Sequence, residues 1–274
     1  MTAIATSGRK PLRAPLAILA VLLVAFLLVN HYRTIGWRDI ISPAYWARVR
    51  SGENLYQPEA AALWHGNPAL PEVALTFDDS PHPESRAQIL NVLKSHSVKA
   101  TFFDVGKNVS DHPDLVRRTL AEGHEIANHS MYHNRLDSLT PEKRHREIND
   151  ADIAFYAIAQ QHLKYLRPPG MRFNRDVLNE NRRLGYVLIG YNVASRDSEV
   201  EQSSGSISAK TMERVENGSI VLLHDYPNTA QALPAILDSL QKRGLRCVTI
   251  SEMLAHLPDK QRNAVQEYIT TGAK

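Results

Sequence analysis

The sequence predicts an α/β fold in which about seven parallel strands close, or nearly close, into a barrel. Short apolar or β-branched runs alternate with helix-like stretches from residue 72 onwards. Most stretches between the runs are long enough for the crossover connections that parallel strands require. The chain has 274 residues and is 43% hydrophobic, which suffices to bury the core of one such barrel. The pattern therefore favours a barrel over an open, doubly wound sheet.

The amino terminus predicts a transmembrane segment. Residues 14–30 contain APLAILAVLLVAFLLV, and basic residues precede this run within residues 1–13. At a rise of about 1.5 Å per residue the run falls just short of a bilayer core, although its flanks can extend it. No small-x-small cleavage site follows closely, so an uncleaved anchor is favoured over a cleaved, secreted form. In both cases we expect the basic flank in the cytoplasm and the rest outside it, in the periplasm or extracellular space.

The remaining chain divides into three parts. Residues 31–70 mix aromatic and polar residues with prolines, and we interpret them as a juxtamembrane connector. Residues 71–257 carry the regular alternation, in the runs EVALTF, KATFFDVG, HEIAN, KYLRP, YVLIGYNV, SIVLLHD and LRCVTI. Thr140 followed by Pro141 predicts the start of a long helix within this part. Residues 258–274 are expected to be a polar C-terminal tail.

Composition narrows the classes of function. The formal net charge is only +3 and the basic residues are scattered, which argues against a nucleic-acid-binding surface. Cys247 is the only cysteine, so the chain forms no internal disulfide and offers no cysteine cluster for a metal. Any metal ion must therefore be held by His, Asp or Glu.

Ionisable side chains end five of the apolar runs. In chain order they are Asp78 with Asp79, His129 with His133, Arg167, Asp197, and His224 with Asp225. Barrel enzymes build their active sites at the carboxyl ends of the strands, so we expect these side chains at one rim. Each has an ordinary structural explanation when taken alone, as a turn former, a residue on a helix face or a surface ion-pair partner. Their joint occurrence favours a catalytic rim.

The spacing of two histidines suggests metal chemistry. His129 and His133 are four residues apart, and on one helical turn their Cβ atoms would lie about 5–6 Å apart. Two imidazoles and a carboxylate can share one metal ion and leave a position open for water. Such a site suits hydrolysis of an ester or amide, with a nearby carboxylate and a histidine opposite it moving protons.

Five segments resemble, in order, the motifs of a known enzyme family. They are TFDDSP (76–81), HSMYH (129–133), RPPG (167–170), SRDS (195–198) and LLHD (222–225). The resemblance is to the polysaccharide deacetylase family, also called carbohydrate esterase family 4 or the NodB-homology domain. It implies a distorted, incomplete (β/α) barrel and metal-dependent removal of acetyl groups, mostly N-acetyl groups, from an acetylated glycan.

The resemblance assigns the central roles residue by residue. Asp78 resembles the catalytic base, and Asp79, His129 and His133 resemble the ligands of a divalent metal ion, usually zinc. His224 resembles the general acid.

The resemblance also implies supporting and substrate-binding roles. Arg167 would orient the base, and Asp197 would tune the acid histidine. Leu222 would line the pocket for the acetyl methyl group. A backbone N–H near Pro169 and Gly170 would stabilise the oxyanion.

Three positions depart from the family pattern. Ser80 replaces a glycine, while Gly170 and Ser198 stand where relatives often have an aromatic residue and a tryptophan. Ser80 leaves both carboxylates in place, whereas Gly170 and Ser198 predict a more open site. Turnover or substrate preference is therefore in question more than the type of reaction.

The sequence therefore predicts an exported, membrane-tethered deacetylase that acts on a cell-envelope or extracellular glycan. Two alternatives remain at this stage. One is hydrolysis of O-acetyl esters or another small amide in the same site, and the other is a catalytically silent glycan-binding protein. The polymer, the native metal and the oligomeric state are left open.

Overall fold

The computed structural model describes residues 56–57, 62–199 and 202–272. The predicted transmembrane segment, residues 14–30, and most of the predicted connector lie outside the described residues. Within the described part of the chain, no helix combines the length and the apolar character needed to cross a membrane.

The described residues form one curled sheet with the strand order β1-β2-β7-β6-β5-β4-β3-β9-β8, and β10 pairs with the start of β3. All pairings are parallel except that of β1 with β2. The strands are β1 (Tyr56–Gln57), β2 (Ala62–Leu63), β3 (Glu72–Ser80), β4 (Thr101–Asp104), β5 (Glu125–Asn128), β6 (Tyr165–Leu166), β7 (Val187–Ile189), β8 (Val193–Ala194), β9 (Ser219–His224) and β10 (Arg246–Cys247).

The run YVLIGYNV is not one strand but two, β7 and β8, which lie towards opposite ends of the strand order. Four Cα steps of about 3.8 Å connect the end of β7 to the start of β8, so these two parts of the sheet lie within about 15 Å of each other. Asn192 N–H donates to the Ile220 carbonyl at 3.2 Å, and Gly66 N–H donates to the Gly218 carbonyl at 2.7 Å. The sheet therefore curls into an incomplete barrel, as expected.

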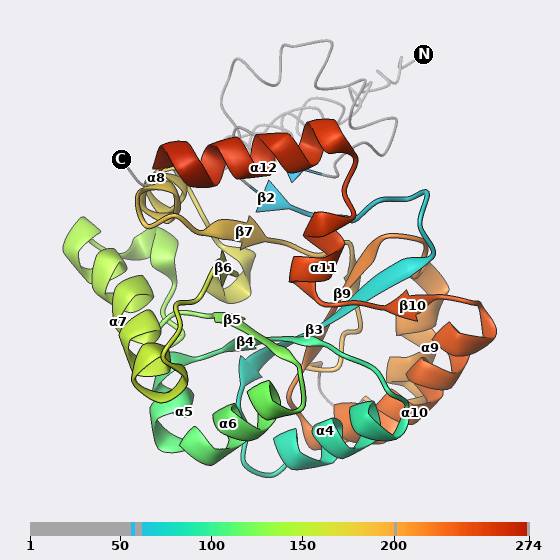
Figure 1. Cartoon of the computed structure of the whole chain (residues 1–274). Helices are drawn as coiled ribbons and strands as arrows, with labels where there is room; N and C mark the ends of the chain where they lie inside the picture. Colours follow the sequence, from blue (N-terminus) through green and yellow to red (C-terminus); the bar gives the residue numbers. More distant parts are fainter. Residues whose placement is uncertain (1–55, 58–61, 200–201, 273–274) are drawn as a thin grey trace, which may run out of the picture. The chain divides into compact units, whose positions relative to one another are not determined.

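The helices surround the strands (Figure 1). They are α4 (Arg86–Ser95), α5 (Gly106–Asp111), α6 (Pro113–Ala121), α7 (Pro141–Ala159), α8 (Arg175–Arg183), α9 (Ser204–Arg214), α10 (Pro227–Lys242), α11 (Ile250–Ala255) and α12 (Asp259–Gly272). Thr140 caps α7 as predicted, because its hydroxyl accepts the Lys143 N–H at 3.4 Å. This cap precedes Pro141, whose missing N–H costs nothing at the first helical position.

The sheet and the core extend beyond the limits expected for the barrel domain, residues 71–257. Ala62 and Leu63, within the predicted connector, are fully buried and form β2, so the sheet begins before residue 71. The predicted polar tail contains α12, whose Val265 is buried in the same apolar cluster as Phe103 of β4 and Met253 of α11. Both segments are short or sparse in apolar residues, which hid their contribution to the core.

Candidate active site

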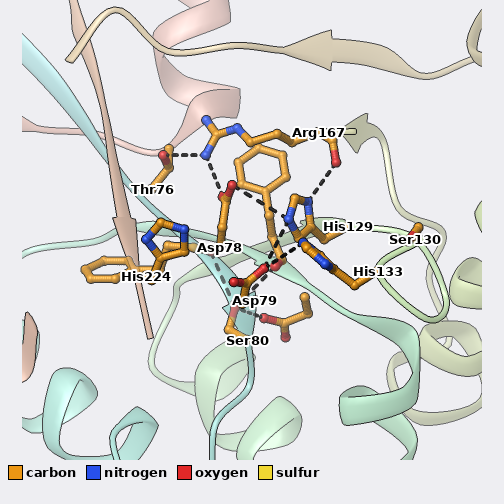
Figure 2. Close-up of polar contacts among 12 residues, drawn as sticks. Thr76, Asp78, Asp79, Ser80, His129, Ser130, His133, Arg167 and His224 are labelled. Carbon is orange, nitrogen blue, oxygen red and sulfur yellow. Dashed lines mark hydrogen bonds and ion pairs between the residues drawn. The ribbon is translucent and has the colours of Figure 1, made fainter. Parts of the chain in front are cut away.

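The end of β3 directs two consecutive carboxylates to one site. Successive side chains of a regular strand face opposite sides of the sheet. Here the register with β4 shifts between Phe77 and Ser80, and Asp79 has a left-handed φ of 65°. Such a bulge turns a side chain away from its regular direction. Asp78 and Asp79 therefore both approach the histidines of the next motif (Figure 2).

Asp79, His129 and His133 bring three metal-ligating atoms together. One ligand atom from each residue lies within 4.8 Å of the others. Asp79 Oδ1 is 3.4 Å from His129 Nε2 and 3.0 Å from His133 Nε2. Burial favours the neutral carboxyl, but the two imidazoles outweigh it and hold the pKa of Asp79 well below its usual range. The adjacent Asp79 carboxylate raises the pKa of His133, against a smaller opposing effect of burial.

The atoms of this cluster fit a bound cation. His129 Nδ1 lies 2.7 Å from the Arg167 carbonyl oxygen, so Nδ1 is the donor and the lone pair that could bind a metal ion is at Nε2. That lone pair faces Asp79 Oδ1, which is buried and has no hydrogen bond among the described residues. A divalent ion between these atoms would satisfy all of them at once, and two imidazoles with a carboxylate are a ligand set for zinc.

The histidines do not lie on a helical turn, contrary to expectation. Residues 129–133 form a loop in which Ser130 and His133 have left-handed φ values of 66° and 58°. Glu147 of α7 holds this loop, because its side chain accepts the Tyr132 N–H at 3.0 Å and the Asn134 amide at 2.6 Å. The two rings still meet, with centroids 5.0 Å apart.

Arg167 contacts Asp78 through its side chain and His129 through its backbone carbonyl. Its side chain is fully buried and donates from Nη1 to Asp78 Oδ1 at 2.6 Å and to Thr76 Oγ1 at 2.8 Å. Two further donations, to the carbonyls of Ile189 and Gly190, fix the guanidinium. Asp78 Oδ2 has no hydrogen bond among the described residues, so this oxygen is available for chemistry.

His224 lies on the opposite side of the two aspartates from His129 and His133 (Figure 2). It is the direct register partner of Asp78, because β9 pairs with β3. Asp197 Oδ1 lies 2.7 Å from His224 Nδ1, and Asp197 Oδ2 accepts the His224 N–H at 2.7 Å and the Thr229 hydroxyl at 2.6 Å. Burial lowers the pKa of His224, but the Asp197 carboxylate outweighs it and raises that pKa overall.

The expected substrate-binding positions frame an open rim. Leu222 is half-buried on β9, and Pro169 is buried. Gly170 is exposed with a φ of 61°, and a Cβ there would meet nothing within 4 Å. Ser198 is exposed as well. Gly170, where a side chain would meet no neighbour, and the exposed Ser198 are consistent with the more open site expected from these two departures.

The third departure, Ser80, is tied to a buried network that sequence reasoning missed. Ser80 Oγ donates to Asp104 Oδ1 at 2.5 Å, and Arg86 Nη2 donates to the same oxygen at 2.6 Å. Arg86 Nε donates to Asp225 Oδ2 at 2.8 Å. Asp104 ends β4, so the test of polar strand ends that found the other residues could have found it. Arg86 carries no such signal, because it is the first residue of α4 and does not end a strand.

Tyr226 was also missed. Its hydroxyl donates to Asp79 Oδ2 at 3.1 Å, and its ring stacks on His224. Its position two residues after His224 was the only available signal.

This fold and this arrangement of three imidazoles, three carboxylates and an arginine define a hydrolase-type barrel site, and the comparisons identify its family. Residues 65–189 match the family model for polysaccharide deacetylase. A peptidoglycan-N-acetylglucosamine deacetylase of Bacillus cereus is 37% identical over 190 residues, which are 67% of this chain and 88% of that protein. A chitooligosaccharide deacetylase of Rhizobium leguminosarum bv. trifolii is 38% identical over 187 residues, 68% of this chain and 84% of that protein.

A solved structure agrees with these relatives. The Bc1960 peptidoglycan N-acetylglucosamine deacetylase, in complex with 4-naphthalen-1-yl-N-oxidanyl-benzamide, has a TM-score of 0.68 and 30% identity, covering 70% of this chain and 92% of that chain. The chain therefore belongs to the polysaccharide deacetylase family, which confirms the resemblance read from its motifs. It is accordingly a hydrolase of the class that acts on carbon–nitrogen amide bonds.

Proposed function

We propose that this enzyme removes N-acetyl groups from the amino sugars of a cell-envelope or extracellular glycan, with peptidoglycan and chitooligosaccharides as the leading substrate classes. One observation carries the proposal. A cluster of metal-ligating atoms from Asp79, His129 and His133 lies beside Asp78, whose free oxygen faces the same space. The curated relatives named for peptidoglycan and chitooligosaccharide support the choice of substrate.

The same three residues would hold the divalent metal ion, for which zinc is our choice because of the imidazole and carboxylate donors. When bound there, such an ion supplies a Lewis acid that polarises the acyl oxygen and makes water more acidic. The chain's own groups perform the proton transfers described next.

In this proposal, Asp78 Oδ2 takes the proton of the attacking water while Arg167 holds Oδ1. The water oxygen forms a bond to the acetyl carbon, and a backbone N–H near Gly170 stabilises the oxyanion. Asp197 orients His224 through Nδ1, so Nε2 is left to give its proton to the sugar nitrogen as the carbon–nitrogen bond breaks. The products are acetate and a free amino sugar. Leu222 and Pro169 would bound the space for the acetyl group.

We also propose that the catalytic domain works outside the cytoplasm, attached to the membrane through residues 14–30. This setting rests on the apolar run and its basic flank, and it would place the site next to an envelope glycan.

The decisive experiment measures acetate release by the 274-residue chain after zinc has been stripped and then restored. The substrates would be N-acetylglucosamine oligomers, peptidoglycan fragments and an O-acetylated xylan. Zinc-dependent release from the N-acetylated substrates supports the proposal. Release from the O-acetylated polymer alone would replace it with an esterase activity. Zinc binding without release from any substrate would favour a silent glycan-binding protein.

A further inference from the structure

Tyr226 contacts both the metal-ligating cluster, through Asp79, and the proposed general acid, His224. It lies between the end of β9 and the start of α10, and the rigid ring of Pro227 follows it at the first helical position. Its backbone N–H donates to the His224 carbonyl at 2.9 Å, which keeps the two residues side by side. The Tyr226 side chain is half-buried.

The hydroxyl of Tyr226 donates a hydrogen bond to one oxygen of the Asp79 carboxylate. It donates to Oδ2 at 3.1 Å, while Oδ1 faces His129 and His133 and has no hydrogen bond among the described residues. The carboxylate therefore has one oxygen used by the protein and one directed at the imidazoles. Without the tyrosine donor, the carboxylate could rotate or present both oxygens.

The ring of Tyr226 constrains His224. The two rings are nearly parallel, with an interplanar angle of 8° and centroids 5.2 Å apart. Asp197 restrains the edge of the imidazole at Nδ1, and the tyrosine covers one of its faces. The edge contact and the face contact together leave the imidazole little rotational freedom.

We propose that Tyr226 is a positioning residue that fixes Asp79 as a single-oxygen metal ligand and holds the His224 ring in its stacked orientation. This inference rests on the proposed function and adds a residue that acts on the metal site and the acid at once. Outer hydrogen-bond partners of metal ligands set the orientation of the ligands and alter metal affinity about 10- to 100-fold when lost.

Two substitutions separate the two roles. Tyr226→Phe keeps the ring and removes the donor, so we expect the zinc dissociation constant to rise about 10-fold while kcat at saturating zinc changes little. Tyr226→Leu removes the ring as well, so kcat at saturating zinc should also fall, by about 10-fold, because an acid histidine contributes only when it is aligned. KM should change less than kcat in both variants.

Tyr156→Phe is the matched control. Tyr156 lies on α7 and stacks on His162, with centroids 4.6 Å apart and an interplanar angle of 22°, away from the metal-ligating cluster. It is therefore a second tyrosine–histidine stack, and loss of its hydroxyl should leave zinc affinity and kcat unchanged.

The measurements are zinc titration against a chromophoric chelator, the visible absorption of the Co²⁺-substituted chain, and acetate release at saturating zinc. The inference predicts weaker zinc binding and an altered Co²⁺ spectrum for Tyr226→Phe but not for Tyr156→Phe. Unchanged zinc affinity in Tyr226→Phe would overturn the inference. If metal-free Tyr226→Phe also melted at a lower temperature than the wild type, the hydroxyl would contribute to stability and not to metal binding. If the wild-type chain itself bound zinc but released no acetate, the proposed function would fail while the effect of Tyr226 on zinc binding could still be scored.

Discussion

Two buried arginines, Arg167 and Arg86, are built into the molecule in the same way but serve different ends. Each is fully buried and stacks over a phenylalanine of β4, Arg167 over Phe103 at 4.0 Å and Arg86 over Phe102 at 3.9 Å. Each pairs with an aspartate at the end of a strand. Adjacent residues of a strand face opposite sides of the sheet, so one arginine lies on each side.

The difference lies in the oxygens of the paired carboxylates. Arg167 binds Asp78 Oδ1 and leaves Oδ2 without a hydrogen bond among the described residues, 3.8 Å from His129 Nε2. Arg86 binds Asp225 Oδ2, and the other oxygen of Asp225 accepts the Ser85 hydroxyl at 2.8 Å. Asp104, the other partner of Arg86, also has one oxygen, Oδ2, that is buried and has no hydrogen bond among the described residues. What distinguishes Asp78 is that its unbonded oxygen lies beside His129 of the metal-ligating cluster, where it can accept a proton from a reacting group. The identity and burial of the pair do not by themselves mark an active site.

The largest expected effect is on kcat, and it tests the role of Asp78 Oδ2 as a proton acceptor. Asp78→Asn keeps the shape of the side chain and its acceptor for Arg167 but removes the base. We expect kcat for acetate release to fall about 1000-fold, within the range for loss of a general base, with zinc affinity and fold retained. Steady-state kinetics with zinc titration of the same preparation measures both quantities. An Asp78→Asn variant with full activity would remove Asp78 from the role of base.

The next effect concerns the histidine that Arg167 orients through its carbonyl. His129→Ala removes a proposed ligand that is buried and held at Nδ1, and we expect zinc affinity to fall by more than the about 10- to 100-fold that loss of an outer hydrogen-bond partner costs. His133→Ala should cost less, about 10-fold, because that side chain is 45% exposed and water can replace it. Zinc titration of the two variants tests the order. Equal losses of zinc affinity would mean that the burial of each histidine does not determine how much it contributes to zinc binding.

The part of the site that the sequence predicted follows from strand geometry. Parallel strands of a barrel bring their carboxyl ends to one rim, so polar residues that end apolar runs were expected to converge. Asp78 and His224 are register partners for this reason. The same rule, applied to every run, would have added Asp104.

Other features depend on contacts that no local pattern encodes. The bulge that turns Asp78 and Asp79 to the same site depends on pairing with β4, and the left-handed loop of His133 depends on Glu147 from α7. In the run YVLIGYNV only Gly190 and Asn192 interrupt the apolar residues, and its division into β7 and β8 accompanies the curl of the sheet. Strand β2 has two residues, too few for a periodic signal.

A third prediction makes the same substitution in the supporting pair. Asp225→Asn leaves Arg86 paired with Asp104 but weakens the fully buried contact. We expect the free energy of unfolding to fall by about 2–3 kcal/mol, because the charge is lost and one donor faces an amide. Urea unfolding gives the stability, and kcat per folded molecule should stay within a few-fold of the wild type. A 1000-fold loss of kcat in a folded Asp225→Asn variant would erase the distinction between the two arginines.

The smallest effect concerns pH, and it tests a third buried carboxylate, Asp197. A general acid works while it is protonated, and Asp197 raises the pKa of His224 above its ordinary 6.5, so activity should be lost only as pH rises through that raised value.

The same pair also makes stability depend on pH. His224 lowers the pKa of Asp197 from its ordinary 3.8, despite burial, which by itself raises it. The pair therefore stabilises the fold from above about pH 4 to a pH above 6.5, and this contribution is lost on either side.

In Asp197→Asn the burial of the imidazole remains and the opposing carboxylate is gone, so the pKa of His224 should drop. The alkaline limb of the kcat profile should then move to lower pH, while zinc affinity at neutral pH stays close to that of the wild type. Acetate release measured from pH 5 to 10 at saturating zinc locates the limb. An unmoved limb would show that another group limits the reaction at high pH, and Asp197 would then resemble Asp225, a buried carboxylate that supports the structure without tuning the chemistry.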